Sequence, residues 1–259
     1  MHLSVSLMKR LLSVSNLVNR KNKIVIACMP KTASTFLQYV LADLGGLPIK
    51  DVCAPYGDGS EQDDLELPAV VDASFGGFVT HMHTRGTLNN VKLMKMAGIK
   101  PVILTRNIFD ITVSIRDQAD KLGLLRWPMV RFVESFRELD RTTQFDYVID
   151  LCLPWFFSFH ALWSGVEKED DLKVHWLTYE TFMVDKPAAV HAMCGFCGIK
   201  ATREEATAVI DRLEGDRRKY NYNVGKVGRG ADQLSEAQQR RIVRFASYYP
   251  GVDFTRLGL

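Results

Sequence analysis

The chain has 259 residues, of which 47% are hydrophobic and 24% are charged, so it is long enough to bury one large core and we expect one domain over residues 23–259. The net charge of +3 is too small by itself to indicate a nucleic-acid partner. Lys9 and Arg10 interrupt the one apolar stretch near the start, so no segment reaches the roughly 18 to 20 apolar residues of a transmembrane helix. Five cysteines, an odd number without a dense framework, favour a reducing compartment, and we expect a cytoplasmic protein.

Residues 1–22 form a basic extension, since no Asp or Glu precedes Asp43. Residues 7–20 are compatible with an amphipathic helix packed on the domain. An acid-poor start that contains Ser and Arg also resembles an organelle transit peptide, and the sequence leaves these two alternatives open.

The first regular elements are a strand over residues 23–29 and a helix over residues 36–46. The strand is predicted by a continuous apolar, β-branched run, which is typical of a parallel strand covered on both faces. The helix is predicted by apolar residues at helical spacing, and Gly45 and Gly46 end it. Together they form half of a βαβ unit.

Further strands and helices alternate along the chain. Residues 47–77 are rich in Gly, Pro and acid, and we expect an irregular excursion there. The apolar patterns then predict, in order, a strand (75–83), a helix (91–99), a strand (100–106), a helix (107–122), a helical middle (126–166), a strand (172–179), paired helices through 213, a basic Gly-rich loop and a closing helix. This order predicts a three-layer α/β fold with a mainly parallel central sheet flanked by helices.

The turn between the first strand and its helix is a candidate anion site. In Pro30–Thr35 a lysine and small residues occupy the turn, and the positive end of the helix dipole points at the same place. A Walker A loop would need GxxxxGK, and here Lys31 comes early without a glycine beside it, which disfavours an ordinary NTPase.

A second candidate anion site follows the strand over residues 100–106. Arg106 ends that strand, and Ser114 lies eight residues further on, within the next helix, close enough to help bind a second phosphate. Both sites fall at the carboxyl ends of parallel strands, where open α/β sheets bind ligands.

At these residues the chain resembles sulfotransferases that use 3′-phosphoadenosine 5′-phosphosulfate (PAPS). The segment PKTASTFL is similar to the family's 5′-phosphosulfate loop, PKSGTTW, and RNIFDITVS is similar to its 3′-phosphate segment, RNPxDxxVS. Weaker similarities are FVTHMH to the strand that ends in the catalytic histidine, PWFFSFHALW to an aromatic helix, LTYETF to the YED turn, GFCGIKATREEATAVIDR to the FLGI helix pair, and NVGKVGRG to RKGxxGDW. They cover roughly residues 23–235.

The resemblance implies a P-loop NTPase-like fold and a PAPS-dependent sulfotransferase that needs no metal and releases 3′-phosphoadenosine 5′-phosphate (PAP). Lys31 would stabilise the leaving phosphate and His81 would be the general base, in an in-line transfer to the hydroxyl or amine of a small-molecule, carbohydrate or lipid acceptor. The implied donor ligands are Lys31, Thr32, Ala33, Ser34, Thr35, Phe36, Arg106, Ser114, Tyr179, Gly225, Lys226 and Gly228, and the expected acceptor contacts are His83, Trp155 and Phe156.

The choice of base stays open between two histidines. His81 matches the family position, but His83 lies two residues on, where a strand would present it on the same face. Val79 stands where many members have a lysine.

The C-terminal basic motif departs most from the family. Asn223 and Val224 replace the usual Arg and Lys, so that Lys226 or Arg229 would have to supply the lost charge. Phe36 replaces a Trp, and Thr181 leaves the YED turn incomplete.

Two other functions compete with sulfuryl transfer. A nucleotide-dependent kinase would share the strand, loop and helix, and a non-catalytic nucleotide-binding homologue would explain the altered C-terminal motif. The CxxC at Cys194 and Cys197 has no partner pair at zinc spacing, which disfavours a metal or redox site. Oligomeric state and acceptor cannot be read from the sequence.

Overall fold

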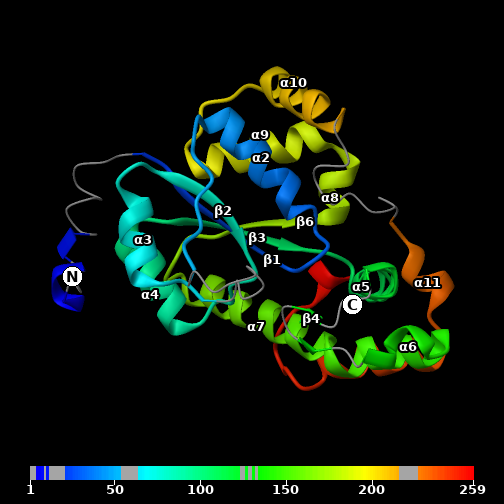
Figure 1. Ribbon diagram of the computed structural model, residues 1–259. Coiled ribbons are helices and arrows are strands. Elements are labelled where there is room, and N and C mark those ends of the chain that lie inside the picture. Colours follow the sequence, from blue (N-terminus) through cyan, green and yellow to red (C-terminus); the bar gives the residue numbers. More distant parts are fainter. Residues whose placement is uncertain are drawn as a thin grey trace.

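The computed structural model describes residues 4–8, 10–11, 21–53, 64–122, 126–127, 130–131, 134–215 and 227–259. A four-stranded parallel sheet lies at the centre, in the order β2-β1-β3-β6 (Figure 1). Its strands are β1 (Lys23–Cys28), β2 (Phe78–Met82), β3 (Lys100–Thr105) and β6 (His175–Thr178). All four expected strands are therefore present, each within a few residues of its predicted bounds.

Helices cover both faces of the sheet, which confirms the expected three-layer α/β class (Figure 1). One face packs against α2 (Ser34–Gly45), α9 (Lys186–Cys197) and α10 (Arg203–Glu214). The other packs against α3 (Leu67–Ser74), α4 (Leu88–Ala97), α5 (Ile108–Leu122), α6 (Arg141–Leu151), α7 (Leu153–Glu169) and α12 (Glu236–Ala246). The remaining elements are α8 (Tyr179–Val184), α11 (Arg229–Gln233), the 3-10 helices η1 (Glu134–Glu138) and η3 (Thr255–Leu257), and the strands β4 (Arg126–Trp127) and β5 (Val130–Arg131).

Alternate residues of β1 enter two separate cores. Ile24 and Ile26 pack with α2, whereas Val25 and Ala27 pack with the helices on the opposite face, and all of these side chains are fully buried. A strand buried on both sides needs apolar residues at every position, which is why β1 reads as a continuous run.

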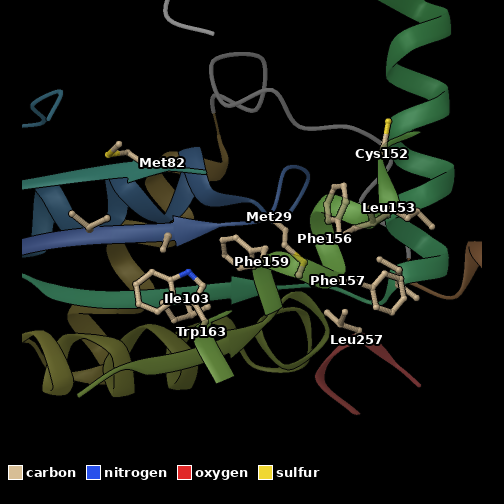
Figure 2. Packing of buried hydrophobic residues seen from close by; sticks show 14 of the residues in the cluster. Met29, Met82, Ile103, Cys152, Leu153, Phe156, Phe157, Phe159, Trp163 and Leu257 are labelled. Atoms are coloured by element: carbon tan, nitrogen blue, oxygen red, sulfur yellow. The ribbon is translucent and has the colours of Figure 1, made fainter. Parts of the chain in front are cut away.

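The core on the α7 side is rich in aromatic rings. Phe156, Phe159 and Trp163 point from α7 towards the sheet, near Met29 and Ile103 (Figure 2). Each is fully or almost fully buried. At roughly 1.5–3 kcal/mol for each buried large apolar side chain, this cluster fixes α7 below the carboxyl ends of the strands.

Two predictions for the connections are wrong. Residues 126–131 form the short antiparallel pair β4–β5 rather than helix, and regular α-helix begins only at Arg141, after η1. The excursion over 47–77 contains α3, whose Val70, Val71 and Ala73 bury an apolar face. A short amphipathic stretch inside a polar segment gives too little periodicity to be recognised.

The basic N-terminal extension is described only over residues 4–8 and 10–11, which are helical apart from Ser4. Most of the helix expected over 7–20 lies outside the described residues. Among the helices that the structure describes, none is both long and apolar enough to cross a bilayer.

Candidate active site

The loop between β1 and α2 has an unusual backbone. Lys31 and Ala33 both have positive φ, 71° and 63°, although neither is glycine. Such residues cost about 1–2 kcal/mol each, and they occur where a loop must curl its N–H groups around an anion. Ala33 is also the N-cap of α2 and makes no side-chain cap hydrogen bond. The loop therefore has the form that the sequence predicts for a phosphate site.

The hydroxyls of this loop are turned inward. Thr32 is buried, and its Oγ1 donates to the Met29 carbonyl at 2.7 Å. Ser34 is also buried and hydrogen-bonds the Cys28 thiol. Backbone N–H groups, rather than these hydroxyls, are the donors that the loop offers to a ligand, and Thr35 is the partly exposed hydroxyl of the predicted set.

The two predicted anion sites form one site. Arg106, at the end of β3, donates from Nη1 to the Lys31 carbonyl at 3.0 Å, although 75 residues separate the two. Its guanidinium lies over the ring of Tyr179, 4.1 Å from the centroid, and Glu180 accepts from the N–H of Asn107. Burial lowers the pKa of Arg106, while Tyr179, Asp110 and Glu180 oppose this shift.

Lys31 extends from the loop to α5. Its Nζ donates to Gln118 Oε1 at 2.5 Å. Burial, followed by the nearby charges of Arg106 and Lys121, lowers the pKa of Lys31 to about 8, and Asp117 partly opposes them. Ser114, one turn before Gln118 on α5, is buried. The sequence analysis missed Gln118, although its position four residues after Ser114 places both on one helix face.

His81 and His83 differ in their place on β2. The register sets His81 level with Ile26 inside the sheet, where its Nδ1 contacts Gln38 of α2. His83 follows the end of β2, and its Nδ1 lies 2.9 Å from the Cys28 carbonyl oxygen, at the end of β1 beside the anion loop. Burial lowers both pKa values, that of His81 to about 4.

The aromatic helix α7 brings Trp155 to His83. The two rings meet edge to face with centroids 6.3 Å apart, and Trp155 also stacks on Phe159 at 5.2 Å. The indole Nε1 of Trp155 is buried and has no hydrogen-bond partner among the described residues. Phe156 is fully buried and contacts Trp155 edge to face, so it supports the tryptophan from behind.

Two predicted donor ligands cannot be placed. Gly225 and Lys226, together with Asn223 and Val224, lie outside the described residues. Gly228 is described and donates its N–H to Asp110 Oδ2 at 2.7 Å. Phe36 is buried beside Phe182 with ring centroids 6.2 Å apart, and its contact with adenine stays a prediction.

The CxxC cysteines are unsuited to redox chemistry. Cys194 and Cys197 are fully buried free thiols, and burial raises their pKa to about 11 and about 12. No group of three or more His, Cys, Asp or Glu side chains in the described part of the chain could hold a metal ion.

The family model for the sulfotransferase domain matches residues 64–244, well over half of the chain. The chain belongs to the sulfotransferase domain family. This assignment favours sulfuryl transfer over the kinase alternative. No curated protein sequence matches this sulfotransferase.

Solved structures similar to this sulfotransferase share its fold at low sequence identity. Mouse sulfotransferase SULT7A1 complexed with PAP has a TM-score of 0.62 and 15% identity, over 95% of this chain and 91% of that one. Retinol dehydratase in a complex with retinol and PAP has a TM-score of 0.57 and 15% identity, over 96% and 87%. The alignments extend over nearly the whole chain, including β1 and the anion loop that precede residue 64.

Proposed function

We propose that this sulfotransferase transfers the sulfuryl group of PAPS to a hydroxyl group of a small-molecule acceptor. The observation that carries the proposal is the bond between Arg106 and the Lys31 carbonyl, which joins two anion-binding segments in one site. A donor with phosphates at both its 5′ and 3′ ends fits two adjacent cationic segments, whereas a donor with one phosphate chain needs only one. PAP in the complexes of both similar structures supports this choice of donor.

Lys31 is the group that stabilises charge on the leaving phosphate. Sulfuryl transfer, like phosphoryl transfer, depends mainly on alignment and on neutralising the charge that develops on the bridging oxygen. The side chain of Lys31 is held at the amino end of α2, where the helix dipole acts on the same charge.

A histidine of the pair at positions 81 and 83 is the base, and the contacts favour His83. A carbonyl oxygen only accepts, so the contact with Cys28 requires the proton of His83 on Nδ1 and leaves the Nε2 lone pair for the acceptor hydroxyl. The indole N–H of Trp155 lies beside the same ring and is suited to bind the acceptor oxygen. His81 remains the alternative.

A small molecule is the acceptor class with the most support. Retinol dehydratase has been crystallised with retinol and with androsterone. Carbohydrate and lipid acceptors belong in the same screen, because acceptor loops vary on a constant scaffold. The five free thiols support a cytoplasmic location.

The test is a transfer assay with sulfur-labelled PAPS against alcohols, phenols, sugars, lipids and amines. We expect Lys31→Ala to lower kcat about 100- to 1000-fold, because it removes a cation from the developing charge. Lys92→Ala, an exposed lysine on α4, is the matched control and should leave kcat unchanged. PAP binding without transfer to any acceptor would overturn the catalytic proposal and favour a binding protein.

Two histidine variants decide the base. His83→Gln should lower kcat by about 100-fold or more, whereas His81→Gln should retain activity within about tenfold. The opposite ranking would assign the base to His81.

A further inference from the structure

The C-terminal helix α11 is fixed to α5 by a buried carboxylate. Asp110 accepts from the N–H of Gly228 at 2.7 Å and from the N–H of Gly230 at 2.8 Å, one with each oxygen. A Cβ on Gly230 would lie 2.4 Å from Phe109 Cβ, so the two segments are in direct backbone contact. Arg229 lies between these two anchored glycines, and its backbone position is therefore determined by α5.

The side chain of Arg229 turns towards the predicted donor site. Its Nη2 lies 2.5 Å from Asp117 Oδ2, and both side chains are about one-fifth exposed. The next residue on α5, Gln118, accepts from Lys31. Adjacent residues of one helix thus hold the loop lysine and the C-terminal arginine.

Arg229 is also near Arg106. Its positive charge lies close enough to add to the burial that lowers the pKa of Arg106. Two guanidinium groups that repel each other in a partly buried site indicate that an anion binds there, because only an anion offsets the cost of bringing them together. Asp117 binds Arg229 through one nitrogen, and a guanidinium has five N–H donors, so the group can bind a phosphate as well.

We propose that Arg229 binds the 3′-phosphate of the donor beside Arg106, with Asp117 as its counter-ion in the empty site. The proposal rests on the proposed function. In the family pattern the basic residues come at the front of the glycine motif, where this chain has Asn223 and Val224. Here the charge lies at the other end of the motif, on a residue that Asp110 anchors through its neighbours.

The test compares two nucleotides by titration calorimetry: PAP, which has the 3′-phosphate, and adenosine 5′-monophosphate, which lacks it. Arg229→Ala should weaken PAP binding about 10- to 100-fold and leave binding of the monophosphate within twofold. Arg229→Lys should recover part of the loss. Arg240→Ala, an exposed arginine on α12, is the control and should change neither affinity.

A purely structural role for Arg229 predicts a different result. If Arg229 only holds α11 on α5, Arg229→Ala will weaken both nucleotides equally, or neither, and the proposal is overturned. Failure of the proposed function has its own signature, since wild-type protein would then bind neither nucleotide.

Asp117→Asn gives a second, independent outcome. If Asp117 is only a counter-ion that competes with phosphate, the variant should bind PAP at least as tightly as wild type. A loss as large as that of Arg229→Ala would show that the ion pair is a structural link, and it would contradict the proposal. Thermal unfolding of each variant separates these results from misfolding.

Discussion

The two ends of the proposed donor site are built in different ways. The loop from Pro30 to Ala33 connects neighbouring elements, β1 and α2, and its internal bond from Thr32 to Met29 spans three residues. The segment from Gly228 to Gly230 is positioned by α5, more than 110 residues earlier in the chain, through Asp110 and Asp117. The difference teaches that one end of the site is a local motif, whereas the other depends on the packing of α11 on α5.

The largest expected effect comes from disturbing the long-range end. Gly230→Ala should push α11 away from Phe109, because the added Cβ would lie 2.4 Å from that residue's Cβ. The bonds to Asp110 would be lost with it, and we expect PAP affinity to fall at least tenfold and the free energy of unfolding to fall by about 2–4 kcal/mol. Isothermal titration and urea unfolding measure the two quantities.

Gly195→Ala on α9 is the matched control for this change. Nothing lies within 4 Å of its added Cβ, so alanine there should raise the unfolding free energy by about 0.5–1 kcal/mol. If Gly230→Ala behaved like Gly195→Ala, the close packing of α11 on α5 would not position the donor site.

The pH dependence of the reaction tests the place where the two ends meet. Lys31 must carry its proton to stabilise the leaving phosphate, and burial together with Arg106 and Lys121 lowers its pKa to about 8. As pH rises through that value the ammonium is lost, so kcat/KM should fall by up to about tenfold for each pH unit.

Lys31→Arg is the control for the pH profile. A guanidinium keeps its proton throughout the accessible range, so the activity that remains in this variant should show no fall above pH 8. A fall at the same pH in Lys31→Arg would assign the titration to another group.

The smallest effect is expected from a change inside the local loop. Thr32→Val keeps the shape of the side chain and removes the bond to the Met29 carbonyl, which should lower the unfolding free energy by about 1–3 kcal/mol. PAP affinity should fall less than in Gly230→Ala, because the backbone between β1 and α2 stays tied at both ends. A larger loss of affinity in Thr32→Val would show that the local loop is the more fragile end.

Much of the fold was predictable because its signals are local. Continuous apolar runs marked the strands, and helical spacing of apolar residues marked α2, α4 and α5. The pair β4–β5 was missed because strands of two residues have no detectable period. Helix α3 was missed because its eight residues follow a polar stretch.

The predictions for the site divide in the same way. Lys31 and Arg106 were recognised from their positions after apolar strands, and the structure places them in contact. Asp110 was visible within the RNIFD segment, but its partners, the N–H groups of Gly228 and Gly230, cannot be read from spacing. Gln118 and Asp117 carry no motif, and they matter because α5 passes beside the loop.

By itself, the sequence determined the α/β class, the anion loop between β1 and α2, and the resemblance to sulfotransferases, since each depends on residues close together in the chain. Only the tertiary structure decided that Arg106 contacts Lys31, that His83 rather than His81 lies at the end of β1, and that Arg229 turns towards the same place. The physical reason is that side-chain partners more than 50 residues apart are chosen by the register of the sheet and by helix packing, and neither leaves a periodic trace in the sequence.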